Sequence, residues 1–234
     1  MNREVIIACD FQDQEKVLTF LDRFTEEKPF VKIGMEVFYG NGPAIVREIK
    51  ARGHKIFLDL NLHDIPNTVY KSMRKLAELD VDMVNVHAAG SIEMMRAARR
   101  ALDEKVSRAL LLAVTQLTST SEEVMQRELW IDHSMADTVR HYALNAKEAG
   151  CDGVVCSPLE AGLVAKACGS DFVTVTPGIR FANDEKGDQK RVTTPAMAHD
   201  LGSSFIVVGR SITGADDPVE AYRRAAREFA EGVQ

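Results

Sequence analysis

Two carboxylates stand close together in the stretch IFLDLNLHDIPNTV, residues 56–69. Asp59 belongs to an apolar run, and Asp64 follows in the polar segment behind it. Two acids this close call for a cation between them, because like charges destabilise each other. Residue 61 lies between them and is Asn, whose amide carries no charge and does not donate a proton on any useful scale. The spacing indicates an electrostatic array that lacks one cation.

A second apolar run, FVKIG, carries the nearest cation, Lys32. An unpaired buried ammonium is costly and tends to lose its proton, so Lys32 must have an acidic partner. Asp59 is the nearest candidate, and Asp10 ends the first apolar run. Asp64 has two alternative interpretations: it faces a neighbouring subunit, or it is an acid at a helix N-terminus with Pro66 in the first turn.

Two glycine-arginine pairs follow the last two apolar runs, in TPGIR and VVGRS. Gly178 and Gly209 would let backbone N–H groups approach a ligand, while Arg180 and Arg210 would supply bidentate cations. These features predict that a phosphorylated small molecule binds here. For each pair, the alternative is an ordinary turn followed by a surface arginine.

Eight short apolar runs alternate with amphipathic segments, which is typical of a parallel sheet covered on both faces. We therefore predict an α/β protein, a (β/α)8 TIM barrel that forms a single domain over residues 1–234. A doubly wound open sheet is the weaker alternative, because no G-x-G-x-x-G motif follows the first run. The predicted strands are residues 5–10, 30–34, 55–60, 83–88, 109–117, 153–157, 172–179 and 205–211.

Polar residues end these runs, where a barrel of this kind carries its catalytic groups. They are Asp10, Lys32, Asp59, His87, Thr115, Ser157, Thr176, and Gly209 with Arg210. For His87, Thr115 and Ser157 taken singly we favour an ordinary structural role, but the pattern as a whole indicates a site.

The segments between the runs are predicted to be helices. Residues 36–53 read as one helix that ends at Gly53, and residues 92–105 as a helix with Ser91 as N-cap. Two connections are long, residues 117–150 with at least one helix and residues 180–194 without a pattern, and such loops are more often functional lids than accidents. Three methionines in the helical segments are expected to pack in the core: Met73, Met94 and Met95.

The composition limits the partners of the protein. The chain has 234 residues, 45% apolar and 27% charged, and its net charge of -6 argues against a general nucleic-acid binder. It has no long apolar run and no signal-peptide core at its start, so we expect a cytoplasmic protein without membrane contact. We expect no metal and no cofactor, because no ligand spacing or cofactor motif stands out. The cysteines, expected to be small buried side chains, are Cys9, Cys151, Cys156 and Cys168.

In combination these motifs resemble those of the orotidine 5'-phosphate decarboxylases. The family's fingerprint is an acid, a lysine two residues on and a second acid three further, opening into D-I-P-N-T. Here it reads Asp59, Asn61 and Asp64, followed by IPNT. The similarity runs from ACDF through FVKIG, NVHA, VTQLTS, SPLEA and TPGIR to VGRSIT, nearly the whole chain.

The resemblance implies a lyase that decarboxylates orotidine 5'-monophosphate to uridine 5'-monophosphate in de novo pyrimidine biosynthesis, without a cofactor, as a homodimer with shared sites. The residues that match its catalytic positions are Lys32, Asp59, Asn61 and Asp64. Those that match substrate contacts are Asp10 at the ribose, Thr118 at the pyrimidine, and Arg180, Gln189, Gly209 and Arg210 at the phosphate, under a closing loop at 181–193. Those that match contributions from the partner subunit are Asp64, Ile65 and Thr68.

Asn61 departs from the family pattern, in which a lysine protonates the carbanion at C6 as carbon dioxide leaves. With Asn at residue 61, the formal charges of Lys32, Asp59, residue 61 and Asp64 sum to minus one; with lysine there they would sum to zero. We interpret the chain as a catalytically impaired Lys-to-Asn variant, engineered or natural.

Two other functions remain as alternatives. A magnesium-dependent sugar-phosphate decarboxylase or aldolase is disfavoured, because such an enzyme needs a carboxylate where this chain has Lys32. A non-catalytic nucleotide-binding protein is the other alternative, and Asn61 is no handicap to it.

Overall fold

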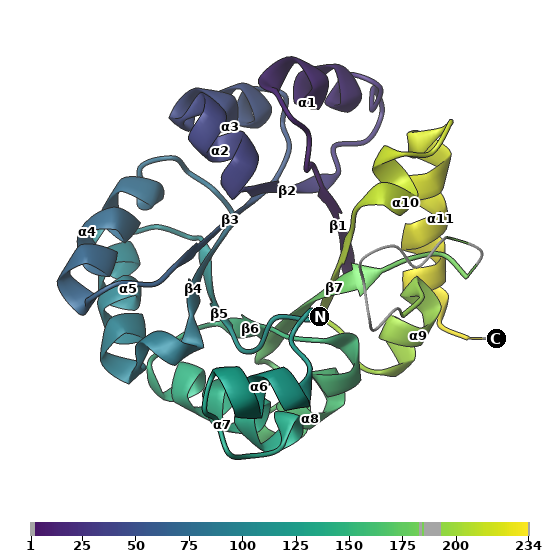
Figure 1. Ribbon diagram of the computed structural model, residues 1–234. Coiled ribbons are helices and arrows are strands. Elements are labelled where there is room, and N and C mark those ends of the chain that lie inside the picture. The colour runs from purple at the N-terminus through teal and green to yellow at the C-terminus, as the bar shows by residue number, and fades with distance from the viewer. Residues whose placement is uncertain (1–2, 183, 185–192, 234) are drawn as a thin grey trace.

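The computed structural model describes residues 3–182, 184 and 193–233. Within these residues, eight parallel strands close into a barrel in the order of the sequence (Figure 1). The predicted (β/α)8 TIM barrel is therefore confirmed. The strands are β1 (Glu4–Ala8), β2 (Phe30–Gly34), β3 (Ile56–Leu62), β4 (Met83–His87), β5 (Leu110–Val114), β6 (Gly153–Val155), β7 (Val173–Ile179) and β8 (Phe205–Val208).

Helices form a ring outside the strands (Figure 1). None of those in the described residues is long and apolar enough to cross a membrane. They are α1 (Gln14–Leu21), α2 (Met35–Asn41), α3 (Pro43–Ala51), α4 (Pro66–Ala77), the 3-10 helix η1 (Ala88–Gly90), α5 (Ile92–Glu104), α6 (Glu122–Glu128), α7 (Met135–Glu148), α8 (Pro158–Cys168), α9 (Pro195–Asp200), α10 (Arg210–Thr213) and α11 (Pro218–Glu231).

The apolar core has two parts, because each strand is covered on both faces. The larger part lies between strands and helices and contains all four cysteines and the three methionines predicted to pack there. The smaller part fills the barrel itself and includes Ile6, Phe57, Met83 and Leu112. A fully buried side chain of this size contributes roughly 1.5–3 kcal/mol. This smaller part of the core fills the interior of the barrel, and polar side chains occupy the carboxyl ends of the strands.

Local signals set the starts of several helices as predicted. The Ser91 side chain accepts a hydrogen bond from the backbone N–H of Met94 at the start of α5. Pro66 occupies the first turn of α4. Ser157 caps α8 in a reciprocal capping box with Glu160, which gives it the ordinary structural role that we favoured.

Some of the predicted element boundaries differ from the structure. Residues 36–53 form two helices, because Gly42 has a φ of 63° and precedes Pro43, a pair that interrupts the helix. The last strand ends at Val208 rather than Ser211, because the chain turns into α10. The segment 117–150 contains two helices, α6 and α7, which agrees with the prediction of at least one helix there.

Candidate active site

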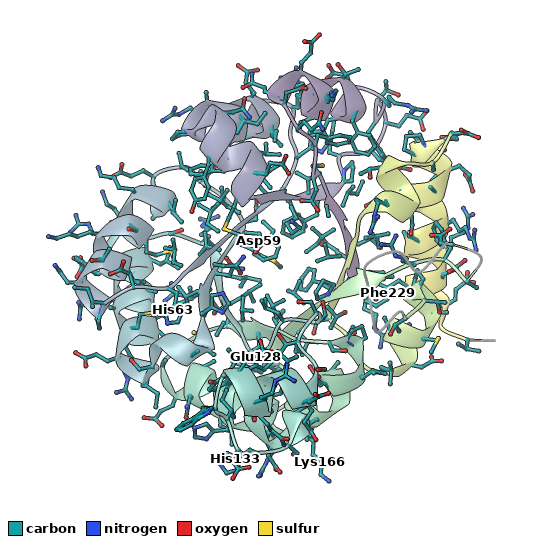
Figure 2. The ribbon with its side chains drawn as sticks, in the orientation of Figure 1. Asp59, His63, Glu128, His133, Lys166 and Phe229 are labelled. Atoms are coloured by element: carbon teal, nitrogen blue, oxygen red, sulfur yellow. The ribbon has the colours of Figure 1, made fainter. Side chains whose placement is uncertain are left out.

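The charged cluster predicted from the sequence lies at the carboxyl ends of the first three strands. Lys32 on β2 places its Nζ 3.0 Å from Asp10 Oδ1 and 3.3 Å from Asp59 Oδ2. The predicted pairing of Lys32 with Asp59 is confirmed, and Asp10 is a second partner. Figure 2 shows Asp59 at the inner side of the ring of strands.

Lys32 is a stable cation in this setting. Its side chain is only 13% exposed. Burial alone lowers the pKa of Lys32, but the negative charges of Asp59 and Asp10 outweigh it and raise the pKa above its ordinary value. The ammonium therefore stays charged at neutral pH and fixes both carboxylates around it.

Gly34 makes room for this ammonium. Gly34 pairs with Asp59 in the sheet, two residues beyond Lys32. A Cβ at Gly34 would lie 3.3 Å from Lys32 Nζ and 3.5 Å from Asp10 Oδ1. Any larger residue would crowd the ion cluster, a role that was not predicted from the sequence.

Asn85 on β4 joins residue 61 to the cluster. Its Nδ2 donates to Asp59 Oδ1 at 2.7 Å and to Asn61 Oδ1 at 2.9 Å. Its Oδ1 accepts from the backbone N–H of Asn61 at 2.8 Å. Asn85 was not among the site residues predicted from the sequence, although it is a lone amide inside the apolar run MVNVH.

Two histidines lie beside this cluster. The rings of His63 and His87 are 5.5 Å apart between centroids. Burial lowers the pKa of His87 and the neighbouring His63 lowers it further, while Asp59 opposes them. His87 is therefore a neutral ring at neutral pH. His63 lies farther from the barrel centre than Asp59, beside α5 (Figure 2).

A cleft of about 310 Å³ brings the predicted phosphate residues to the same place as the ion cluster. Gly178 at its wall has a φ of 81°, a conformation that glycine adopts without strain. Arg180 follows β7 and is 8% exposed. The polar residues and glycines that line the cleft are Asp10, Lys32, Gly178, Arg180, Gly209 and Arg210.

The other predicted site residues are not brought into this cluster. Asp64 is exposed, and its Oδ1 accepts a hydrogen bond from the backbone N–H of Ile65. The Ile65 side chain is 66% exposed, and Thr68 is exposed as well. Thr118 is half-buried in the turn after β5. Gln189 lies outside the described residues.

Fold and site together define a (β/α)8-barrel protein with a charged, arginine-lined pocket at the carboxyl ends of its strands. A sequence model of the orotidine 5'-phosphate decarboxylase / HUMPS family matches residues 3–225. The chain belongs to this family.

Individual relatives agree with this assignment. The chain is 55% identical to orotidine 5'-phosphate decarboxylase from Geobacillus sp. (strain WCH70) over 98% of both chains. It is 55% identical to that from Bacillus mycoides (strain KBAB4) over 100% of this chain and 99% of the relative. The crystal structure of orotidine 5'-phosphate decarboxylase from Lactobacillus acidophilus is 42% identical, with a TM-score of 0.88 over 97% of this chain and 99% of that one.

Proposed function

We propose that this protein is an orotidine 5'-phosphate decarboxylase of de novo pyrimidine biosynthesis, a cytoplasmic, cofactor-independent lyase. We propose further that Asn61 leaves this chain strongly impaired. The observation that carries the proposal is the Asp10–Lys32–Asp59 cluster beside residue 61, in a chain whose full-length relatives bear this name. The enzyme acts on orotidine 5'-monophosphate and forms uridine 5'-monophosphate.

The chemistry requires a cation next to the reacting carbon. The bond between C6 and the carboxylate carbon breaks, carbon dioxide leaves, and the electron pair stays on C6. A fixed ammonium stabilises that charge and then gives C6 a proton. Lys32 is engaged by two acids and is the wrong group for the transfer. Residue 61 is held beside Asp59 through Asn85, so a lysine there would supply both charge and proton, whereas Asn61 supplies neither.

The arginine-lined end of the cleft binds the phosphate of the substrate. Arg180 and Arg210 share this cleft with Asp10 and Lys32, so a nucleotide extends from the arginines to the ion cluster. Binding energy from the phosphate, which takes no part in bond breaking, orients the base and excludes water. Phosphate contacts therefore support the chemical step as well as affinity.

The functional unit is a homodimer in which Asp64, Ile65 and Thr68 complete the site of the partner subunit. All three are exposed in the single chain, so they are accessible to a neighbouring subunit. Asp64 would restore the second carboxylate to each array.

The test is turnover of orotidine 5'-monophosphate, followed by absorbance, in this chain and in Asn61→Lys. Asn61→Met is the matched control, because it has a long unbranched side chain without the charge. We expect Asn61→Lys to exceed the other two proteins by at least about a hundredfold, the scale of general acid catalysis. Absence of turnover in Asn61→Lys would remove the decarboxylase proposal.

A non-catalytic nucleotide-binding protein is the second candidate, and Asn61 is the observation that favours it. In that case uridine 5'-monophosphate binds to this chain and to Asn61→Lys, and neither turns over the substrate. The magnesium-dependent alternative has less support, because Glu36 is exposed in the first turn of α2 and Lys32 occupies the site on β2.

A further inference from the structure

We propose that Asn85 is a positioning residue of the decarboxylation site. Its amide forms hydrogen bonds where the regular pairing of β3 with β4 is interrupted, and these bonds hold Asp59 and residue 61 in place beside the reacting carbon of the substrate. This inference rests on the proposed function and adds to it a residue outside the charged array. The proposed role requires no contact between Asn85 and the substrate.

The first observation is a break in the pairing of β3 with β4. Leu58 pairs with Val84 and Leu62 pairs with Val86, so β3 advances by four residues between these two pairs while β4 advances by two. The extra residues form a bulge, which bends a strand and turns side chains toward a site. Within the bulge Asn61 has a φ of 51°, which Asn tolerates better than most residues.

The second observation is that the Asn85 side chain occupies the gap this bulge creates. The backbone N–H of Asn61, which lies where the regular β3–β4 pairing is interrupted, donates to Asn85 Oδ1 at 2.8 Å. Asn85 is 1% exposed, so water does not reach this pair freely. Without the amide oxygen, the half-buried N–H of Asn61 would lose its acceptor, and the bulge would lose the bond that holds it.

The third observation concerns the other end of the amide. Asn85 Nδ2 donates one bond to Asp59 Oδ1, while Lys32 approaches Asp59 Oδ2. Each oxygen of this carboxylate therefore has its own partner, which fixes its plane as well as its position. The second Nδ2 hydrogen goes to Asn61 Oδ1, so the amide has no free donor.

Only an amide satisfies all of these contacts at this length. An apolar residue of the same size would fill the space, but Asp59 Oδ1 and the backbone N–H of Asn61 would lose their hydrogen bonds to Asn85. A carboxylate keeps the acceptor but puts a further acid against Asp59. Because a shift of about 1 Å in a catalytic group can lower a rate about a hundredfold, Asn85 should affect the chemical step from outside it.

The first experiment is made in the Asn61→Lys protein. Asn85→Leu should lower kcat about tenfold to a hundredfold and change the affinity for uridine 5'-monophosphate, which lacks the carboxylate, by less than about threefold. Thr174→Val is the control, because it removes a buried hydroxyl that accepts a hydrogen bond from the backbone N–H of Ser204, away from the cluster. A kcat for Asn85→Leu no lower than that of Thr174→Val would overturn the proposal.

The variant Asn85→Asp distinguishes the acceptor role of the Asn85 amide from its donor role. Its oxygen still accepts from the residue 61 N–H, but its carboxylate no longer donates to Asp59. Activity should therefore be low at neutral pH and rise relative to Asn61→Lys as pH falls, because a protonated carboxyl can donate again. A constant ratio across the pH range would contradict a donor role toward Asp59.

A readout without turnover keeps this inference separate from the proposed function. In the chain as it stands, hydrogen exchange at the Asn61 amide should accelerate at least about tenfold in Asn85→Leu and stay slow in Asn85→Asp. Equal protection in both variants would overturn the positioning role even if Asn61→Lys is active. If Asn61→Lys is inactive and exchange behaves as expected, only the proposed function fails.

Discussion

Lys32 occupies a strand position that an apolar residue would fill at lower cost. A buried ion pair is weak evidence for stability, because desolvation offsets much of the attraction. Asp10 is 61% exposed and Asp59 21%, so the pairing is open on one side. An ion cluster with one open side, at the mouth of a barrel, is better explained by binding and chemistry than by folding.

The space around Lys32 is a residue-scale constraint that can be tested at Gly34. In the Asn61→Lys protein, Gly34→Ala places a Cβ 3.3 Å from the Lys32 ammonium, which must move by a few tenths of an ångström. We expect kcat to fall about tenfold, because the displaced ammonium carries Asp59 with it. Steady-state kinetics and a melting curve measure the two effects separately.

The matched control for Gly34 is Gly162 on α8. A Cβ there meets only the backbone oxygen of Leu201, at an ordinary 3.5 Å. Gly162→Ala should leave kcat unchanged and raise the unfolding free energy by about 0.5–1 kcal/mol, as in other helix interiors. If Gly34→Ala keeps full activity as well, the close approach to Lys32 has no catalytic consequence.

The sequence predicts part of this site and misses the rest for a physical reason. A lysine in an apolar strand needs an acid, which is a local argument, and it led to Asp59. Asn85 and Gly34 act through the register between strands and through the bulge in β3. No pattern within a single strand encodes a register, so their roles emerge only when the strands are paired.

Two aspartates repeat one arrangement at the opposite, amino-terminal ends of the strands. Asp82 accepts from the backbone N–H of Ile56 and pairs with Lys50 of α3. Asp152 accepts from the N–H of Leu111 and pairs with Arg99 of α5. Each acid thus ties the start of one strand to a helix outside the barrel.

This arrangement predicts a stability effect at Asp152. Asp152→Ala leaves the N–H of Leu111, a buried residue of β5, without its acceptor, which should lower the unfolding free energy by about 1–3 kcal/mol. Asp103→Ala is the control, because it removes the other partner of Arg99 from an exposed position and should cost about 1 kcal/mol or less. Urea unfolding of both variants measures the difference, and equal losses would show that the strand bond contributes nothing.

At the scale of elements the apolar runs predicted all eight strands, and errors occurred where the backbone departs from a regular pattern. Residues 36–53 have helical periodicity throughout, yet Gly42 and Pro43 break them into α2 and α3. The predicted end of β8 was too late, because Gly209 and Arg210 were assigned to the strand although they begin α10. Periodicity reports which face is buried, but the dihedral angles of single residues decide where an element stops.

In the molecule as a whole, the two acids of the motif, Asp59 and Asp64, lie in different places. Asp59 lies in the barrel mouth, whereas Asp64 is exposed beside the start of α4. The proposed dimer, in which these residues enter the site of the partner subunit, would account for the separation and would make activity a property of two chains together.

This exchange can be tested by mixing two impaired proteins. The chain as it stands lacks the lysine but has Asp64, whereas the double variant Asn61→Lys, Asp64→Asn has the lysine and lacks the acid. If Asp64 acts across the interface, a mixed dimer contains one complete site, and random pairing of equal amounts makes about a quarter of all sites complete. Activity should appear after mixing, in proportion to subunit exchange, although each protein alone is poorly active. If Asp64 acts within its own chain, the activity of the mixture stays the average of the two.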